Sequence, residues 1–438
     1  MTTAVPRAGV ARALARLMGP DLPLAVTAYD GSCHEPPAPV ATVHVRSPLA
    51  LRRALAAPGQ LGLARAYVAG DLDVEGDLYS LLELQDRLDG LSVRPSAWPD
   101  LLRLLRSEGV LGRPPAPPAE EARVRGRRFS RSRYGDAIAH HYDVSNEFYR
   151  LVLGPSMTYS CAVWADPSVG LEAAQQAKHE LVSRKLGLRP GMRLLDVGCG
   201  WGGMVLHAAQ NHGVGAVGVT LSAEQAALAR RRVVDAGLTD RIEIREQDYR
   251  QVTDGPFDAI SSIGMFEHVG AEQLPTYFGR LHGLLTPGGR LLNHGISQPA
   301  GRRPGGRDGF IDRYVFPDGQ LQEIGRVTTA VQNAGFEVRH VEGLREHYAL
   351  TLRAWVSNLE ERYDQAVTQV GAGRARIWRL YLAGSAVGFE AGQIEVHQTL
   401  AVRSNGGRSG MPPRPDWDRS GEWAVDAGGG RPEEEQST

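Results

Sequence analysis

The residues best suited to do chemistry begin with a glycine-rich stretch, LLDVGCGWGG, at positions 194–203. An apolar segment there ends in Asp196 and runs into Gly198 and Gly200, where a backbone without Cβ atoms can approach a ligand closely. The carboxylate of Asp196 can accept a hydrogen bond from a cationic amino group, and the stretch lacks the Lys-Ser/Thr ending of a phosphate-binding loop. The pattern therefore favours S-adenosylmethionine as the ligand, with a ligand-free strand–helix turn as the alternative.

Polar residues follow the next two predicted strands, at the edge where such a ligand would lie. Thr220 and Gln225 can hydrogen-bond ribose hydroxyls, although many nucleotide-binding sheets carry an acid at this place. Ser222 and Gln225 also have the spacing of a helix capping box, and both interpretations can hold together. After the third strand, Asp248 can accept from an adenine amino group with Tyr249 beside the ring. A solvated loop acid is an equal alternative for Asp248.

Composition and cysteine spacing exclude several classes of function. Residues 261–269, SSIGMFEHV, lack the Asn/Asp-Pro-Pro-aromatic string of many base-methylating enzymes, and a net charge of -1 gives no basic field for nucleic acid. The three cysteines, Cys33, Cys161 and Cys199, show neither a disulfide framework nor a paired zinc spacing, so we expect a reducing cytoplasm and no bound metal. We also expect no membrane-spanning segment and no signal peptide, because no apolar run has the required length or order.

Short apolar segments alternate with helical stretches between residues 134 and 403, and these elements must position the motifs. This alternation predicts βα units and a parallel sheet. The expected fold is therefore a doubly wound, Rossmann-like α/β domain that binds its ligand beyond the carboxyl ends of the strands. The candidate strands are 193–197, 216–219, 242–246, 257–262 and 290–295.

Residues 1–105 are expected to form a smaller α+β domain. An amphipathic segment at 10–18 predicts a helix, and apolar alternation at 41–45 predicts a strand. Residues 61–74 and 78–88 have helical spacing. We expect this domain to contact lipid or to mediate dimerisation.

A linker and a tail complete the predicted organisation. Prolines interrupt any helix within residues 106–133, and residues 404–438 are poor in aliphatic side chains, which predicts a disordered tail. The linker is interpreted as a solvated connector, with a membrane-contact patch as the alternative. The basic residues on which this alternative rests are Arg123, Arg125, Arg127, Arg128, Arg131 and Arg133.

Five strings in this chain resemble those of the cyclopropane fatty acid synthase family. They span most of residues 134–400, and residues 61–71 are similar, more loosely, to the N-terminal domain of the longer members. The strings are HHYDVSNEFY at 140–149, MTYSCAVW at 157–164, FEHVG at 266–270, FIDRYVFP at 310–317 and YALTLRAW at 348–355. The resemblance implies a class I methyltransferase domain that acts on cis double bonds of phospholipid acyl chains. It also implies peripheral contact with the inner face of the membrane and a homodimer.

The resemblance further implies a bicarbonate ion in the active site. Its ligands would be the side chains of Cys161, Glu267, His294 and Tyr348 and the backbone N–H of Ile296. Taken alone, Cys161 fits a buried apolar thiol and His294 a structural histidine. Gly295 departs from the family pattern, in which we expect a small or hydroxyl side chain, so the segment is expected to be less rigid. The implied cofactor contacts include Tyr159, Ser160, Gly198, Thr220, Leu221, Gln225, Asp248 and Ile263.

The implied chemistry makes specific demands on the site. An isolated alkene is a weak nucleophile, so the electrophilic methyl group must be held close and in line. The transfer leaves a carbocation, which calls for a dry site and aromatic faces such as that of Tyr348. A base must then remove a proton from the added methyl group, and a small bound anion suits this role because a neighbouring carboxylate could itself be alkylated. The alternatives are a methyl-branched or methylene product, a small-molecule methyltransferase, and a non-catalytic cofactor- or lipid-binding protein.

Overall fold

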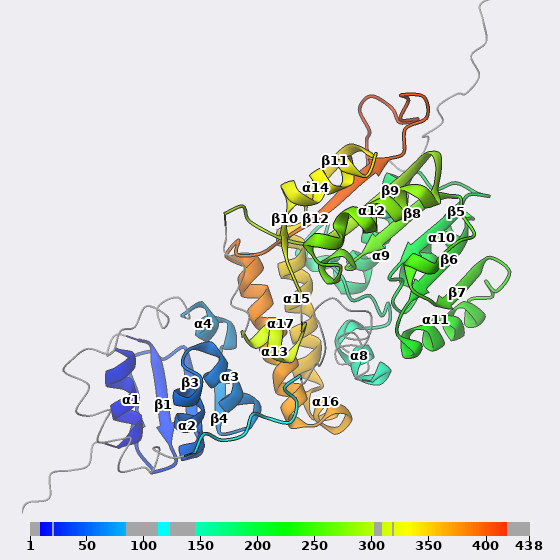
Figure 1. The fold of residues 1–438 in the computed structure, drawn as a ribbon. Helices are drawn as coiled ribbons and strands as arrows, with labels where there is room; N and C mark the ends of the chain where they lie inside the picture. Colours follow the sequence, from blue (N-terminus) through cyan, green and yellow to red (C-terminus); the bar gives the residue numbers. More distant parts are fainter. Residues whose placement is uncertain are drawn as a thin grey trace, which may run out of the picture.

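The computed structural model describes residues 9–19, 22–84, 113–122, 145–301, 309–317 and 319–417. The six linker arginines, residues 140–144 of the first family-like string and the tail beyond residue 417 lie outside the described residues. Two sheets are present, and a group of helices lies between them (Figure 1). These helices are α15 (Arg345–Glu361), α16 (Tyr363–Val370) and α17 (Ala372–Glu390).

A small mixed sheet with the strand order β2-β1-β3-β4 forms the N-terminal region. Strands β1 and β3 are parallel, and the other two pairs are antiparallel. Val26 and Val45 of this sheet share a buried cluster with Ala11, Ala50 and Ala66 of the covering helices, as expected of a small α+β domain. The elements are α1 Val10–Met18, β1 Leu24–Ala28, β2 Cys33–His34, β3 Ala41–Val45, α2 Pro48–Ala56, α3 Gln60–Val68, β4 Leu72–Gly76 and α4 Leu78–Glu83.

The helix predicted over 61–74 is wrong in its second half. Helix α3 ends at Val68, and Gly70 then adopts a φ of 76°, a left-handed conformation that favours glycine and ends helices. The following residues form β4, in which Val74 lies opposite Val43 of the antiparallel strand β3. Leu72 and Val74 are two residues apart, as is usual for one face of a strand. Their positions also continue the helical spacing of the preceding residues, which explains the wrong prediction.

The larger sheet has eight strands, in the order β11-β12-β9-β8-β5-β6-β7 with β10 beside β9. Strands β9, β8, β5, β6 and β7 are parallel, whereas β12 pairs antiparallel with both β9 and β11. All five predicted strands are present, which confirms the α/β class. The bounds are β5 Arg193–Val197, β6 Gly215–Thr220, β7 Ile242–Glu246, β8 Phe257–Ile263, β9 Leu285–Gln298, β10 Gln322–Glu323, β11 Glu337–Gly343 and β12 Glu395–Val402.

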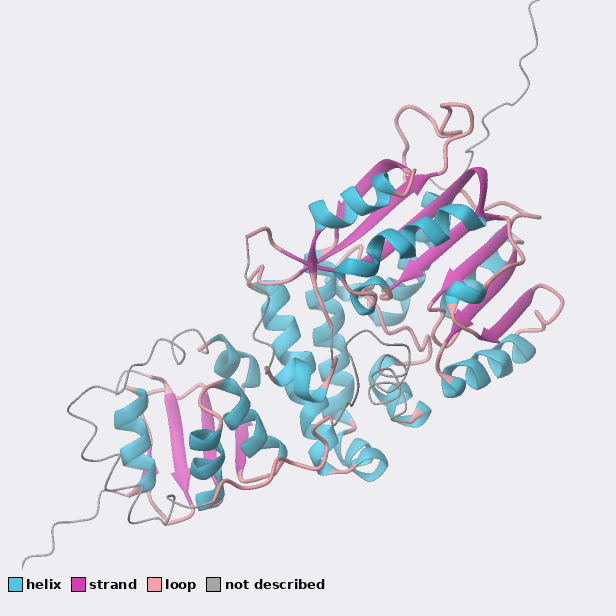
Figure 2. Cartoon of the chain, viewed as in Figure 1, coloured by secondary structure: helices cyan, strands magenta, loops and turns pink. Residues whose placement is uncertain are grey.

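Helices pack on both faces of this sheet, so it is doubly wound (Figure 2). On one face, Leu281 of α12 and Val327 of α14 share a buried cluster with Ile260 of β8. On the other face, Val182 of α9 and Val205 of α10 belong to a second buried cluster with the strands. The helices of this part are α8 Asn146–Leu153, α9 Leu171–Leu186, α10 Gly203–His212, α11 Ala223–Asp235, α12 Leu274–Leu284, α13 Phe310–Tyr314 and α14 Ile324–Asn333.

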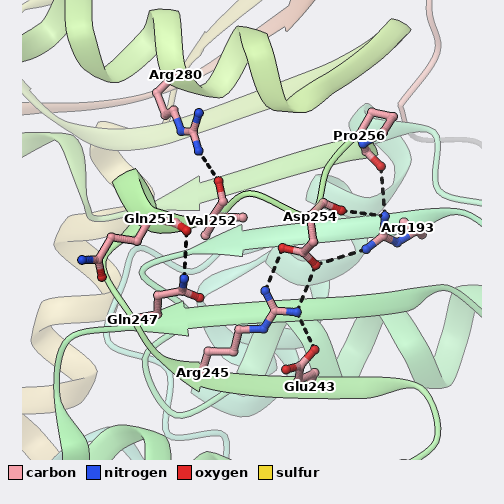
Figure 3. Close-up of polar contacts among 9 residues, drawn as sticks. All are labelled: Arg193, Glu243, Arg245, Gln247, Gln251, Val252, Asp254, Pro256 and Arg280. Carbon is pink, nitrogen blue, oxygen red and sulfur yellow. Dashed lines mark hydrogen bonds and ion pairs between the residues drawn. The ribbon is translucent and has the colours of Figure 1, made fainter.

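Ion pairs lie along the edge strand β7 and connect it to the neighbouring segments (Figure 3). The guanidinium of Arg245 lies 2.6 Å from Glu243 Oε2 and 2.8 Å from Asp254 Oδ1. Asp254 also lies 3.5 Å from Arg193, the first residue of β5. Charged side chains on an edge strand discourage pairing with another chain. Arg193 and Asp254 lie at the amino ends of β5 and β8, away from the carboxyl ends where a ligand site is expected.

Helix α17 packs against the N-terminal region and holds it against the rest of the molecule. The guanidinium of Arg376 lies 3.6 Å from Asp73 of β4. Arg379 donates a hydrogen bond to the hydroxyl of Tyr67 on α3 at 3.3 Å. Apolar residues of α3 and α4 also belong to the same buried cluster as Trp378. Both apolar and charged contacts therefore hold the small sheet against this helix.

Candidate active site

A cavity lies at the carboxyl ends of β5, β6, β7 and β8, where doubly wound sheets bind their ligands. Gly198 and Gly200 beside it have φ values of 80° and 53°, which favour glycine. The N–H of Gly198 donates to the carbonyl of Val219 at 2.9 Å and ties the loop to β6. All eleven residues predicted to contact the cofactor line this one cavity, although their individual roles stay predictions. They are Tyr159, Ser160, Asp196, Gly198, Gly200, Thr220, Leu221, Gln225, Asp248, Tyr249 and Ile263.

Asp196 is a buried acid at the end of β5. Burial raises the pKa of its carboxyl to about 6, although a hydrogen bond from Ser261 and the charge of Lys178 act in the opposite direction. The Ser261 hydroxyl donates to Asp196 Oδ1 at 2.7 Å and fixes the orientation of the carboxyl group. An ionised Asp196 would accept a hydrogen bond from the amino group of the predicted cofactor, and burial would strengthen that contact.

The polar residues after β6 make local contacts that agree with both interpretations of their spacing. The hydroxyl of Ser222 accepts from the N–H of Gln225 at 3.2 Å, which confirms that Ser222 caps helix α11. The hydroxyl of Thr220 donates to Gln225 Oε1 at 2.8 Å. The Gln225 side chain therefore faces the cavity with its amide group oriented by Thr220.

Asp248 is not a solvated loop acid, since it is only 4% exposed. Arg250 pairs with its carboxylate through two contacts, Nε to Oδ1 at 2.9 Å and Nη2 to Oδ2 at 2.5 Å. The ring of Tyr249 packs edge-to-face against Tyr277 with a centroid distance of 5.2 Å. The ion pair was not predicted from the sequence, and Arg250 must share the carboxylate if Asp248 accepts from adenine.

Glu267 and Ile296 are in direct contact, and neither is among the residues that line this cavity. The backbone N–H of Ile296 donates to Glu267 Oε1 at 2.7 Å, whereas the resemblance assigned this N–H to the anion. Glu267 Oε2 is buried, and no described residue hydrogen-bonds to it. Burial raises the pKa of Glu267 to about 7, and the Ile296 hydrogen bond offsets only part of this shift. Glu267 therefore exchanges a proton close to neutral pH.

His294 lies two residues before Ile296 on β9 and is also buried. Its Nδ1 lies 3.2 Å from the Nε2 of Gln398 on β12, and its Nε2 has no hydrogen-bond partner among the described residues. Burial lowers the pKa of His294 well below its usual value, and the charges of Lys178 and Lys185 lower it further. The imidazole is therefore neutral at physiological pH.

Cys161 and Tyr348, the other two predicted ligands, both contact the carbonyl of Leu344, but Tyr348 does so only through its backbone N–H. The Cys161 thiol lies 3.7 Å from the carbonyl of Leu344, which also accepts from the N–H of Tyr348 at 3.1 Å. Burial raises the pKa of Cys161 far above its usual range, so the thiol is a weak donor and not a nucleophile. Ile296 packs against the apolar cluster that contains Cys161 and Tyr348. None of the five predicted anion ligands is among the residues that line the cofactor cavity, and their role as ligands stays a prediction.

Gly295 occupies a position where no side chain fits. A Cβ atom there would lie 2.0 Å from Cε1 of Phe266 and 3.0 Å from Oε1 of Glu267. Gly295 lies inside β9, opposite His397 of β12, so this position belongs to a paired strand and not to a loop. The ring of Phe266 takes the space that a side chain at position 295 would need.

The sequence reasoning missed two buried lysines on one face of α9. Lys178 is 1% exposed and donates to the Ser160 hydroxyl at 3.0 Å. Burial lowers its pKa to about 7, against the raising effects of Cys161 and Asp196. Lys185 is fully buried and donates to Gln398 Oε1 at 2.7 Å. Lys178, Val182 and Lys185 are spaced by four and three residues and therefore share one helix face. The apolar residue Val182 on this face could have indicated that both lysines are buried.

Comparisons with known proteins agree with this geometry. A sequence model of the family described as mycolic acid cyclopropane synthetase matches residues 129–399. The chain is 48% identical over 409 residues to a probable fatty acid methyltransferase of Mycobacterium tuberculosis, covering 90% of this chain and 95% of that protein. It is 33% identical over 367 residues to the cyclopropane-fatty-acyl-phospholipid synthase of Escherichia coli strain K12, covering 83% and 88% respectively. The crystal structure of mycolic acid cyclopropane synthase CmaA1 complexed with SAH and CTAB matches with a TM-score of 0.58 and 35% identity, covering 61% of this chain and 97% of that chain.

The family match includes the glycine loop, the polar residues of the cavity and the predicted anion ligands. SAH, S-adenosylhomocysteine, is what remains of S-adenosylmethionine after methyl transfer. The chain therefore belongs to the mycolic acid cyclopropane synthetase family and is an S-adenosylmethionine-dependent methyltransferase.

Proposed function

We propose that this methyltransferase modifies cis double bonds in phospholipid acyl chains and forms cyclopropane fatty acids. The observation that carries the proposal concerns two buried polar atoms, Glu267 Oε2 and His294 Nε2, for which the described residues offer no hydrogen-bond partner. Glu267 lies between the cavity-lining residues Met265 and His268, and His294 pairs with the cavity-lining Ile263. Methyl transfer to a nitrogen or oxygen nucleophile that is already deprotonated needs no base. Removal of a proton from a newly added methyl group does need a positioned base.

Glu267 Oε2 and His294 Nε2 have the hydrogen-bonding chemistry that a bicarbonate ion requires. Neutral His294 can donate through Nε2–H, and ionised Glu267 can accept from an acidic hydroxyl group. The thiol of Cys161 and the hydroxyl of Tyr348 are further donors in the same region. Bound bicarbonate would supply a base that is weak, small and less readily alkylated than a carboxylate side chain. The carboxylate of Glu267 is held by the Ile296 N–H at 2.7 Å, which would orient it toward such an ion.

The chain itself supplies the dry aromatic surroundings that a carbocation requires. The ring of Tyr159 lies 5.3 Å from that of Trp355, and its hydroxyl donates to Tyr381 at 2.9 Å. The ring of Tyr348 lies 4.7 Å from that of Phe389. All five residues belong to or pack against one buried cluster, and Tyr159 also lines the cofactor cavity, which makes this side of the cavity dry and aromatic.

The reaction balances without a further reactant. The alkene electron pair forms a bond to the methyl carbon as the carbon–sulfur bond breaks, which leaves a cation on the neighbouring carbon. One proton of the added methyl group would pass to the proposed bicarbonate, and the electron pair of that C–H bond then closes the ring. Bound S-adenosylmethionine supplies the electrophilic methyl group.

A methyl-branched or methylene fatty acid is the second candidate product. The 48% identical relative named a probable fatty acid methyltransferase favours it. The same methyl transfer would occur, but a hydride shift would move the cation before the proton is lost. The two outcomes separate only after the methyl transfer, so they require the same cofactor cavity and the same dry site.

Product analysis with trideuteromethyl cofactor tests the proposal. Incubation with vesicles of a cis-unsaturated phospholipid should give a lipid with two deuterium atoms in a cyclopropane ring, as measured by mass spectrometry and proton NMR. A label in an acyclic methyl or methylene group would promote the second candidate. Transfer to free fatty acid but not to phospholipid would overturn the proposed substrate.

We further infer that the enzyme works at the inner membrane surface as a peripheral protein and as a homodimer. In the part of the chain that the structure describes, no helix is long and apolar enough to cross a bilayer. Six arginines between residues 123 and 133 would favour anionic lipid, and salt would weaken the contact because exposed charges are screened within about 10 Å. Unchanged vesicle binding after deletion of residues 123–133 would make this segment only a connector. Sedimentation would test the dimer.

A further inference from the structure

A cluster of two histidines and one glutamate lies outside the active site, between helices α9 and α10. Glu180 is on α9, and His207 and His212 are on α10. Glu180 Oε2 lies 3.1 Å from His207 Nε2 and 3.0 Å from His212 Nε2. Within the described ranges, this is the only group of three or more such side chains whose ligand atoms all lie within 4.8 Å of one another.

We propose that Glu180, His207 and His212 bind one divalent transition-metal ion of the zinc class. Two imidazoles and a carboxylate are ligands that zinc prefers, and three protein ligands leave a fourth position for water. Zinc–ligand bonds of about 2.0–2.1 Å place tetrahedral ligand atoms roughly 3.3 Å apart. The observed 3.0 and 3.1 Å separations need to open by only a few tenths of an ångström.

Neighbouring residues hold the ligands in position. Arg184 donates to the other oxygen of Glu180, Oε1, at 2.7 Å, which leaves Oε2 directed at both imidazoles. The Asn211 side chain donates to the His207 carbonyl at 3.0 Å and lies 3.3 Å from His207 Nδ1. A metal-bound His207 would carry its proton on Nδ1, which the amide oxygen of Asn211 can accept after rotation. Contacts of this kind orient metal ligands in known sites.

The site is accessible from solvent and close to the cofactor loop. The side chains of Glu180, His207 and His212 are 31%, 15% and 18% exposed. Helix α10 begins at Gly203, directly after the glycine loop, and His179 beside Glu180 lines the cofactor cavity. A bound ion would therefore fix the C-terminal end of α10 to α9 and stiffen the helix on which the loop depends. The sequence analysis predicted no bound metal from the cysteine spacing alone, and 27 residues separate Glu180 from His207.

The alternative is a metal-free hydrogen-bonded cluster, in which both imidazoles donate to Glu180 Oε2. Untagged full-length enzyme, treated with a chelator that is then removed, distinguishes the two. We expect Co²⁺ to bind with one equivalent and to show the visible absorption of an ion with nitrogen ligands. Zn²⁺ should displace it and raise the melting temperature in a concentration-dependent manner. Absence of both effects in the wild-type enzyme would overturn the proposal.

Glu180→Gln and His212→Gln test the ligand assignment, and each should weaken metal binding by roughly 100-fold, since even outer partners of a metal site contribute about 10–100-fold. His44→Gln is the matched control: His44 Nε2 lies 3.1 Å from Glu75 Oε2 in a similar pair that lacks a third ligand. This control should bind Co²⁺ like the wild type. Equal Co²⁺ binding by folded Glu180→Gln and His212→Gln variants, as judged by circular dichroism, would place the ion elsewhere and refute the site.

Discussion

The ammonium group of Lys185 donates to Gln398 Oε1 at 2.7 Å and thereby sets the orientation of the Gln398 amide. An ammonium group can only donate, so the atom that it contacts must be the amide oxygen. The amide nitrogen then faces His294 Nδ1 at 3.2 Å and donates to it. The neutral imidazole of His294 must therefore carry its proton on Nε2. A buried lysine thus determines which nitrogen of His294 is a donor.

This relationship predicts the tautomer of His294. Nitrogen NMR of the wild-type enzyme at neutral pH should show the Nε2–H form. Gln398→Met removes the donor to Nδ1, so both tautomers should become populated and methyl transfer should fall by roughly tenfold or more, because a wrong tautomer disables the donor. Affinity for S-adenosylhomocysteine should stay constant. A protonated Nδ1 in the wild-type enzyme would contradict the prediction.

The pKa of Glu267, raised by burial to about 7, predicts a pH dependence of activity. The carboxylate form is needed to accept from an anion hydroxyl, so activity should fall as the pH drops through about 7. Glu267→Gln should lose on the order of 10²-fold in kcat and show no such decline with pH.

Bicarbonate should stimulate carbon-dioxide-depleted wild-type enzyme but not this variant. Full activity of the depleted wild type would exclude the anion as base.

The same pKa predicts a change in stability. Because the folded-state pKa of about 7 exceeds the ordinary value of 4.5, the folded enzyme binds more protons between these values. Glu267 therefore makes the ligand-free enzyme less stable as the pH rises across this window. Glu267→Gln should remove that contribution to the slope. Urea unfolding at several pH values measures it, and identical slopes for both proteins would show that Glu267 is ionised throughout.

Lys178 should influence cofactor binding through Asp196. Its charge lowers the pKa of the Asp196 carboxyl, so Lys178→Met should raise that pKa above about 6 and protonate more of the acid at neutral pH. We expect several-fold weaker binding of S-adenosylmethionine by calorimetry, with recovery at higher pH. Asp196→Ala should abolish binding at every pH, as should Gly198→Val through steric block. Unchanged affinity in folded Asp196→Ala would refute the cofactor assignment.

Gly295 and Phe266 should be energetically coupled. Gly295→Ser places a Cβ 2.0 Å from the Phe266 ring, and overpacking of this kind costs about 1–3 kcal/mol of unfolding free energy. Phe266→Ala should reduce the cost of the serine, so the double variant should be more stable than the sum of the single effects. Gly279→Ala is the control, since no atom lies within 4 Å of a Cβ there and a helical alanine should stabilise by about 0.5–1 kcal/mol. Additive effects at positions 266 and 295 would contradict the coupling.

Local patterns were sufficient to predict the parallel strands and the cofactor cavity. The strand at 193–197 and its glycine loop adjoin in the sequence, so their chemistry could be recognised together. Strand β4 was missed because helical spacing and strand alternation coincide over a few residues. The contact between Lys185 and Gln398 joins residues 213 positions apart, and the sequence contains no signal for such a pairing. The Ile296–Glu267 hydrogen bond was missed for the same reason, because it depends on how β9 meets the segment after β8.

The contact between helix α17 and the N-terminal sheet has a consequence for modularity. Some relatives, including a cyclopropane mycolic acid synthase 2 of Mycobacterium leprae, match only 61% of this chain yet are covered over 94% of their own length. In the present chain, Trp378 shares its buried cluster with residues of α3 and α4, and Arg353 covers the ring of Tyr79 at 4.2 Å. Removal of the first 84 residues would expose apolar surface on the remaining catalytic part, and exposed apolar surface promotes aggregation. The N-terminal region is therefore packed against the catalytic part of this chain, so we expect removal of the first 84 residues to lower the solubility of the remainder.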